Sequence, residues 1–287
     1  MKKIIVIIFI LLFAELFQIA AADRSSLNSK FNEIIQQSIE KNRIPGLAIS
    51  AVKNGEIVYS RGFNGSWSDS KKEITSETPF YIGSISKSFT ALAIMQLVEA
   101  GQIDLDSPVQ NYLNDFRVDM AGFKEIITVR QLLHHQSGLT EEEYFNDLPD
   151  DLSIEAGVED LYGMSLSHNP GTSFSYFNPN YNMLGLIIEE VSGQSYKNYL
   201  SENILRPLEM NNTYLSDEGA AKVISGHGAV FSIPVEREEK YKNYALPAGY
   251  IISTVDDMAN YLLYQLSGEF KGRQLLSADY FNAMHIP

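Results

Sequence analysis

The chain has 287 residues, of which 45% are hydrophobic and 20% are charged, a composition typical of a globular protein. Its formal net charge of −14 would repel a phosphate backbone, so nucleic acid is not expected as a partner. Because the sequence contains no cysteine, it excludes disulfides, thiolate catalysis and cysteine metal sites.

The first residues have the pattern of a secretory signal peptide. Met1-Lys2-Lys3 supplies positive charge, residues 4–14 form an unbroken apolar run, and Ala20-Ala21-Ala22 resembles a cleavage site. Residues 1–22 are therefore predicted to be a signal peptide and residues 23–287 a single domain. The alternative is an uncleaved anchor, although the run is short for a membrane-spanning helix. Both cases predict a secreted or extracytoplasmic protein that contacts a membrane only through an uncleaved N-terminal segment.

The domain is predicted to begin with a helix and a β-hairpin. Apolar residues recur at helical spacing over residues 27–41. Residues 47–53 and 56–63 have the composition of strands, and Asn54-Gly55 between them is a strong signal for a two-residue turn. We therefore expect an antiparallel strand pair directly after the first helix.

The chain is organised around residues 80–101. Residues 89–98 are almost all apolar, which predicts a helix at the centre of the domain rather than at its surface. Gly101 is a suitable helix stop, and Ser84 is a suitable N-cap or first-turn residue. Lys87 is the exception in this segment, because a buried ammonium is costly unless it is paired or loses its proton.

The spacing of Ser84 and Lys87 suggests nucleophilic chemistry. Residues i and i+3 share a helix face, and a desolvated lysine has a lowered pKa and can take the proton of a serine hydroxyl. The N-terminal end of a helix also favours negative charge that develops nearby. The alternative is a capping serine followed by a lysine whose ammonium reaches water. The S-x-x-K pattern alone does not decide between the two.

The remainder of the chain is predicted to be mainly helical, with no internal repeat. The expected helices cover residues 109–113, 128–134, 153–163, 178–192, 196–204, 256–265 and 277–284. Thr128 and Thr254 are suitable N-caps. The pattern of residues 220–247 is ambiguous. The order of elements is thus a hairpin followed by a long helical region.

A second polar pair precedes the helix expected at residues 178–192. In an extended segment the side chains of residues i and i+2 point the same way, so Tyr176 and Asn178 can reach the same site. A phenol near a cationic lysine is favoured toward phenolate and can transfer protons, and an asparagine amide can donate and accept at once. The alternative is an aromatic loop that ends in an asparagine N-cap.

Together these segments resemble the serine β-lactamase and penicillin-binding protein superfamily. Ser84-Ile85-Ser86-Lys87 followed by Tyr176-Phe177-Asn178 is most similar to the class C β-lactamase and D-alanyl-D-alanine carboxypeptidase branch. Further similar stretches, in the order of that branch, are Ile44-Pro45-Gly46, Leu132-Leu133-His134-His135-Gln136-Ser137-Gly138-Leu139, Tyr181-Asn182-Met183-Leu184-Gly185, Pro207-Leu208-Glu209-Met210 with Thr213, and Pro247-Ala248-Gly249. The resemblance implies a β-lactamase/transpeptidase-like α/β (α+β) fold, with an antiparallel sheet, flanking helices and a helical lobe.

The resemblance also implies an acyl-enzyme mechanism. Ser84 would be the acylated nucleophile, its backbone N–H would be one oxyanion donor, and Lys87 would be its proton acceptor or electrostatic partner. Tyr176 would act as general base and acid, and Asn178 would hold the substrate amide. His135 would be structural. Substrates would be amides, β-lactams or esters, either small molecules or peptide and peptidoglycan-like ligands, and no cofactor or metal is implied.

One motif of that branch has no clear match. K-T-G or H-x-G is expected on an edge strand after Pro247-Ala248-Gly249, where it would supply the second oxyanion donor, and Gly226-His227-Gly228 lies too early in the chain. The final sheet strands are therefore expected to be missing, and the domain incomplete at its C-terminus. Losing one oxyanion donor costs about a hundredfold or more in rate. The alternative function is thus a catalytically impaired or non-catalytic binding protein on the same scaffold.

Overall fold

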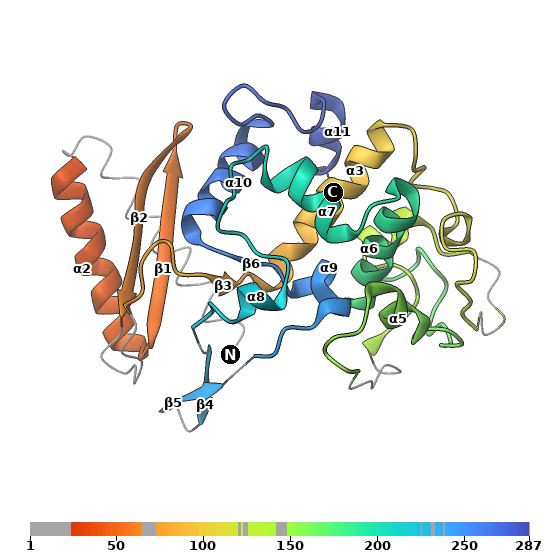
Figure 1. The fold of residues 1–287 in the computed structure, drawn as a ribbon, viewed down its shortest axis with the longest axis horizontal. Helices are drawn as coiled ribbons and strands as arrows, with labels where there is room; N and C mark the ends of the chain where they lie inside the picture. Colours follow the sequence, from red (N-terminus) through yellow and green to blue (C-terminus); the bar gives the residue numbers. More distant parts are fainter. Residues whose placement is uncertain are drawn as a thin grey trace.

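The computed structural model describes residues 24–64, 73–119, 122, 126–141, 148–224, 226–230, 233–237 and 239–286. The predicted signal peptide lies outside the described residues. A helix and a hairpin form one side of the molecule, and a larger helical lobe forms the other (Figure 1). None of the described helices is both long enough and apolar enough to cross a membrane.

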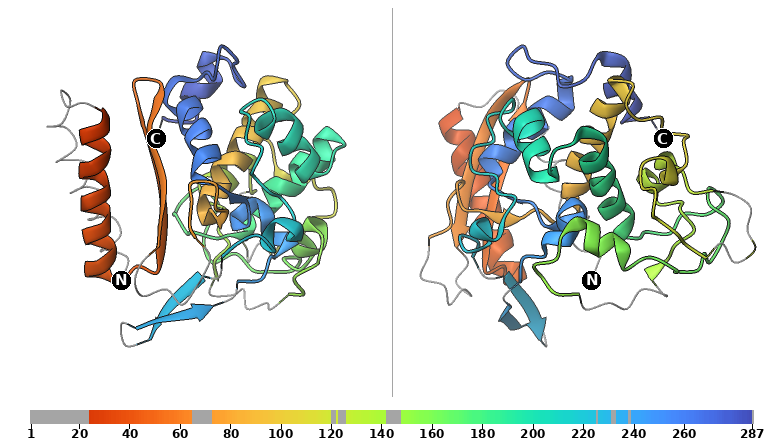
Figure 2. Two further views of the ribbon diagram at one scale, coloured as in Figure 1. Left: turned by 60° about the vertical axis from the view of Figure 1, so that its left-hand side comes forward. Right: turned by 45° about the vertical axis from the view of Figure 1, so that its right-hand side comes forward.

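The hairpin lies between two helices (Figure 2). Strands β1 (Gly46–Lys53) and β2 (Glu56–Asn64) pair antiparallel, which confirms the predicted hairpin. Asn54 and Gly55 have φ values of 52° and 78°, the positive values that the favoured two-residue turn needs. Helix α2 (Arg24–Asn42) covers one face through a small apolar cluster of Phe31, Ile35, Ile39, Tyr59 and Phe63. Helix α10 (Val255–Ser267) packs against β1 and β2 from the other side.

The predicted central helix is confirmed as α3 (Ser86–Glu99). Phe89, Leu92 and Ile94 are fully buried, and Gly101 follows the helix with a φ of 70°. Helices α6 (Pro179–Ser192) and α9 (Leu246–Gly249) both pack against α3 and against each other. This three-helix contact forms the centre of the large apolar core of the lobe.

The other elements surround that contact. They are η2 (Gly83–Ile85), η3 (Val109–Asn111), α4 (Val129–Leu133), α5 (Ile154–Glu159), α7 (Tyr196–Leu200), the π-helical turn η5 (Ser201–Leu205), α8 (Asp217–Ala220), η6 (Asn243–Ala245) and α11 (Ala278–Ala283). Thr128 and Thr254 cap α4 and α10 as predicted. Several helices are shorter than predicted: the one expected at residues 153–163 ends at Glu159, and Gly163 has a φ of 83° that a helix could not include.

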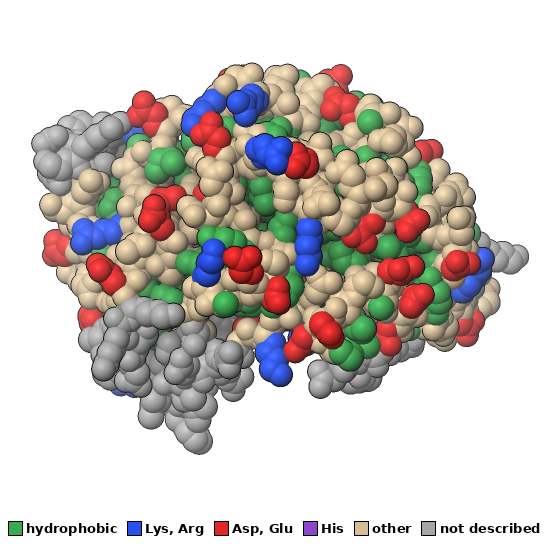
Figure 3. All heavy atoms as spheres, in the orientation of Figure 1, with side chains coloured by type: hydrophobic (Ala, Val, Ile, Leu, Met, Phe, Trp, Pro, Cys, Tyr) green, Lys and Arg blue, Asp and Glu red, His purple; other side chains and the backbone are tan. Residues whose placement is uncertain are grey.

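Two further strand pairs are short and antiparallel. Strands β3 (Phe80–Tyr81) and β6 (Ile252–Ser253) pair just before the start of η2. The ambiguous region contains β4 (Gly226–Val230), which pairs with β5 (Ile233–Arg237). Gly226-His227-Gly228 therefore lies in a separate hairpin and not on an edge strand beside β1. On the face drawn in Figure 3, acidic side chains lie among lysine and arginine side chains, so the negative charge is spread out.

A glycine allows α6 and α9 to approach closely. A Cβ atom added at Gly185 on α6 would lie 2.3 Å from Cγ of Pro247 on α9, well inside van der Waals contact. Since Pro247 is buried in a packed core, it has little room to move away. Gly185 therefore fixes the position of α9 and, with it, the backbone of Ala248.

Gly185→Ala tests this contact. We expect the free energy of unfolding to fall by about 1–3 kcal/mol, because the added methyl group overpacks the α6–α9 contact. Chemical denaturation measures the change. Glu190→Ala on the exposed face of α6 is the control and should change stability by no more than about 0.5 kcal/mol. Equal stability of the two variants would contradict the assignment.

Candidate active site

Ser84 lies in η2, ahead of the central helix, and its side chain is exposed. The predicted N-cap role is wrong: Ile85 occupies the N-cap position of α3, and no side chain caps the helix. The 3₁₀ turn, entered through Gly83 at a φ of 55°, separates Ser84 from the first turn of α3. The hydroxyl instead lies 2.6 Å from the Tyr176 hydroxyl.

Lys87 is buried, with only 7% of its surface exposed, so the alternative of an ammonium that reaches water is wrong. Its Nζ donates to Oγ of Ser84 at 3.2 Å and to Oδ1 of Asn178 at 2.8 Å. The third acceptor is the backbone carbonyl of Ala248, at 2.5 Å. An ammonium group has three protons to donate, so these acceptors satisfy it completely. The fold thereby offsets the desolvation of a buried cation.

Two opposing effects set the proton affinity of Lys87. Burial lowers the pKa of the Lys87 amine from its usual 10.5, while the hydrogen bond and charge of Tyr176 and the charge of Glu141 act in the raising direction. Burial is the largest of these effects, so the pKa is lowered on balance. The neutral amine is therefore reached at a lower pH than for an exposed lysine.

Tyr176 and Asn178 reach the same site, as their i, i+2 spacing predicts. The Lys87 Nζ lies 4.9 Å from the ring centroid of Tyr176, a distance at which a cation is attracted to the ring face. Asn178 occupies the N-cap position of α6, yet its side chain makes no cap bond. The interpretation of Asn178 as a simple cap is wrong, because its amide oxygen accepts from Lys87 and its amide nitrogen donates to Glu141 at 3.1 Å.

His135 supports the tyrosine from behind. It is buried in the turn after α4 with a φ of 55°, and its Nδ1 accepts from the backbone N–H of Phe177 at 3.2 Å. Its ring lies 4.5 Å from that of Tyr176. Burial, with the nearby charge of Lys87, lowers the pKa of His135 from 6.5 to about 4. The imidazole is thus neutral near pH 7 and can accept the bond that orients the Tyr176 segment.

Two participants were not predicted from the sequence. Glu141 holds the Asn178 amide, but it is the first of three consecutive glutamates, and nothing in the sequence distinguishes it from its neighbours. The carbonyl of Ala248 is a backbone group, so it leaves no side-chain signal beyond the Pro247-Ala248-Gly249 motif itself. Among the described residues, no three acidic or histidine side chains are grouped so that they could hold a metal ion.

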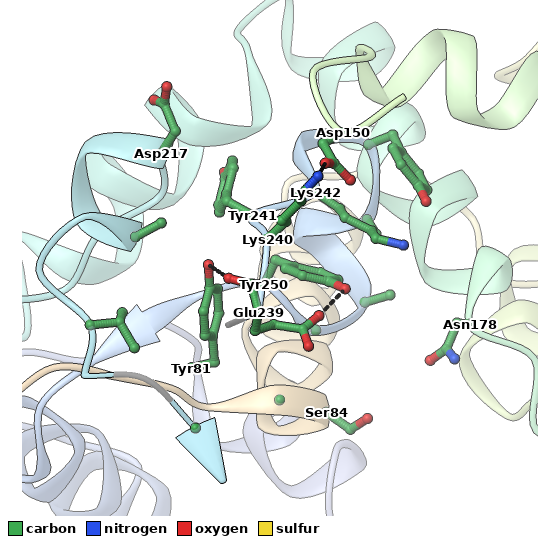
Figure 4. A pocket seen from close by; sticks show the side chains of 18 of the residues that line it. Tyr81, Ser84, Asp150, Asn178, Asp217, Glu239, Lys240, Tyr241, Lys242 and Tyr250 are labelled. Carbon is green, nitrogen blue, oxygen red and sulfur yellow. Dashed lines mark hydrogen bonds and ion pairs between the residues drawn. The ribbon is translucent and has the colours of Figure 1, made fainter. Parts of the chain in front are cut away.

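Ser84 and Asn178 open onto a cavity of about 1210 Å³. Glu141 and Gly249 also line it, and the cavity continues away from the serine toward Tyr81, Tyr250 and Glu239 (Figure 4). An exposed serine, a buried lysine, a tyrosine and an asparagine therefore meet at the wall of a space large enough for a peptide-sized ligand.

The sequence of this chain matches a known protein family. A family model described as Beta-lactamase matches residues 31–284. This chain belongs to the Beta-lactamase family. The family resemblance and the mixed α/β fold class predicted from the sequence are both confirmed.

Relatives within the superfamily differ in name and length. Protein flp of Staphylococcus aureus (strain MW2) is 30% identical over 270 residues, which cover 88% of this chain and 52% of the relative. The octameric penicillin-binding protein homologue from Pyrococcus abyssi is 32% identical, with a TM-score of 0.74 over 90% of this chain and 60% of that one. A class C β-lactamase shares the fold at 23% identity, with a TM-score of 0.73 over 92% and 71% of the two chains. This β-lactamase-family chain thus spans about half the length of the curated relative.

His135→Asn tests the role of the buried imidazole. Because the pKa of His135 is depressed in the folded state, the unfolded chain binds more protons between pH 6.5 and 4, and folding stability falls as the pH falls through this window. We expect the wild type to lose about 2 kcal/mol more than the variant over that range. Asparagine tolerates the positive φ and does not titrate.

Urea denaturation at several pH values gives the comparison, and His134→Asn is the matched control at the neighbouring position. The control should follow the wild type across the pH range. Parallel pH profiles for the wild type and His135→Asn would show that His135 is not held neutral by the fold.

Proposed function

We propose that this β-lactamase-family protein is a serine hydrolase that opens an amide, β-lactam or ester bond through an acyl-enzyme at Ser84. The observation that supports this most is the contact of the Ser84 hydroxyl with the Tyr176 hydroxyl, which would take its proton, and with the Lys87 ammonium. Its Oγ lies 2.6 Å from the Tyr176 hydroxyl and 3.2 Å from the Lys87 Nζ. Both distances are within the reach that general-base catalysis requires.

Acylation follows from these contacts. The Ser84 oxygen attacks the substrate carbonyl and forms a new C–O bond, while its proton passes to the phenolate form of Tyr176. The nearby Lys87 ammonium stabilises that phenolate electrostatically. As the bond to the leaving group breaks, the same proton passes from Tyr176 to the departing nitrogen or oxygen. The backbone N–H of Ser84 is the donor that we assign to the oxyanion.

Deacylation repeats the sequence with water. Water gives one proton to Tyr176 and attacks the ester carbonyl, and the proton then returns to the Ser84 oxygen as the acid is released. We assign Asn178 to hold a substrate amide; in support, its side chain is fixed by Lys87 on one side and by Glu141 on the other. A fixed amide needs little reordering when substrate binds.

The substrate class and the location are part of the same proposal. We infer a small-molecule or peptide and peptidoglycan-like substrate, because the cavity beside Ser84 is large and open to solvent. The sequence of residues 1–22 supports export, so the hydrolase would act outside the cytoplasm. Two of the similar proteins are named as a penicillin-binding protein homologue and a class C β-lactamase, which supports acyl compounds of this kind as substrates.

Intact-mass measurement after incubation with benzylpenicillin and with an activated ester tests the proposal. We expect one covalent adduct on the wild type and none on Ser84→Ala, since that variant lacks the only proposed nucleophile. Ser88→Ala, four residues further along, is the matched control and should keep the adduct, because Ser88 bonds to Ile85 and Tyr261 rather than to the site.

Two results would overturn the proposal. An adduct that persists in Ser84→Ala would place the nucleophile elsewhere. A wild-type chain that is folded by circular dichroism but stays unmodified by both reagents would favour the alternative, a binding protein on a catalytic scaffold.

A further inference from the structure

The cavity beside Ser84 has a distinct second end. Tyr81, Tyr250 and Glu239 line it there, and we call this end the tyrosine arm. The rings of Tyr81 and Tyr250 meet edge to face with centroids 5.7 Å apart. Figure 4 shows the Glu239 side chain between these two rings and the space in front of Ser84 and Asn178. The arm therefore presents aromatic walls and one carboxylate to any ligand that reaches from the serine.

The carboxylate of Glu239 is oriented by a tyrosine hydroxyl. The Tyr250 hydroxyl donates to its Oε1 at 2.9 Å, and the Tyr81 hydroxyl donates to its backbone oxygen at 3.5 Å. Burial and the charge of Glu239 raise the pKa of Tyr81 to about 12, so this phenol stays neutral. No ion pair with Glu239 is found among the residues that the structure describes. The described partner of its Oε1 is thus a neutral phenol and not a cation.

The charged side chains that line the cavity are negative on balance. Its described lining includes four acidic side chains, Glu141, Asp150, Asp217 and Glu239, and two lysines, Lys240 and Lys242. The ammonium of Lys240 lies 3.9 Å from the carboxylate of Asp150, which partly cancels both charges. The lining therefore has a surplus of negative charge, and a cavity with low-dielectric walls concentrates the field of such a surplus.

We propose that the tyrosine arm binds a protonated amino group of the substrate, with Glu239 as its counterion and the rings of Tyr81 and Tyr250 as its walls. Tyrosine faces attract cations, and a carboxylate held by a tyrosine hydroxyl loses little entropy when it pairs. This inference rests on the proposed hydrolase function, because it assigns a substrate class to the same cavity.

The proposal places the amino group on the acyl part of the substrate. In an acyl-enzyme reaction the acyl part stays attached to Ser84 through both steps, whereas the leaving group departs after the first. Binding energy in the tyrosine arm therefore assists acylation and deacylation only if the acyl part occupies it. The substrate class is thus an ester or amide of an amino-substituted acyl group.

A matched pair of esters tests this assignment on the 287-residue chain. p-Nitrophenyl 6-aminohexanoate and p-nitrophenyl heptanoate have the same leaving group and acyl chains of equal length, and differ by a terminal ammonium in place of a methyl group. We expect kcat/KM of the wild type to favour the amino ester by about tenfold, the scale of a hydrogen-bonded charge. Glu239→Gln keeps the side-chain shape and should reduce the preference to within about twofold of unity.

Asp217→Asn is the matched control, because it also removes one carboxylate from the lining of the cavity. It should keep most of the preference for the amino ester if Glu239 is the specific counterion. A preference that survives in Glu239→Gln, or that is absent in the wild type, would overturn the inference.

A binding measurement separates this inference from the hydrolase proposal. Calorimetry on Ser84→Ala with 6-aminohexanamide and heptanamide measures binding without turnover. We expect the amino compound to bind about tenfold more tightly than heptanamide. The double variant that also carries Glu239→Gln should lose this difference in affinity. If no ester is hydrolysed but this difference is found, the hydrolase proposal fails and the amino-group site stands. If heptanoate is hydrolysed in a Ser84-dependent way without any preference, only the amino-group site fails.

Discussion

The burial of one ammonium group constrains most of this structure. Lys87 lies on a helix that is otherwise apolar, and it is tolerated only because three oxygen atoms surround its Nζ. Those oxygens come from η2, from the start of α6 and from α9. The first and the last of them, on Ser84 and Ala248, are 164 positions apart in the sequence. The contact of α3, α6 and α9 brings these oxygens together, and Gly185 allows α9 to approach α6 closely.

The same arrangement gives the serine its chemical surroundings. A cation satisfied by neutral oxygens keeps its charge available to Tyr176, whose ring it faces. Neutral His135 then holds the backbone of Phe177 without adding a second positive charge beside the lysine. Ser84, in contrast, is exposed, because the 3₁₀ turn places it outside the helix at the cavity wall. A buried ammonium at Lys87 and an exposed hydroxyl at Ser84 are thus achieved within four residues.

The sequence predicted the parts that depend on local patterns. The Asn54-Gly55 hairpin, the buried helix α3 and the caps at Thr128 and Thr254 follow from turn chemistry and periodicity, and they are confirmed. The grouping of the candidate site followed from the family motifs, while the catalytic roles stay predictions. Local rules failed where tertiary partners compete for a side chain. Ser84 and Asn178 were both suitable caps, and each instead bonds to Lys87. The carbonyl of Ala248 and the carboxylate of Glu239 could not be chosen from sequence, because only the fold shows what they face.

The proton affinity of Lys87 is the most direct test of this account. An NMR titration of the ¹³Cε signal of Lys87 should give a pKa below the usual 10.5, because burial outweighs the charges that oppose it. Glu141→Gln should lower the pKa further, since it removes a negative charge that favours the ammonium, while Asp150→Asn in the same cavity should leave it unchanged. A pKa at or above 10.5 in the folded wild type would contradict the account, because burial would then not outweigh the charges that favour the ammonium.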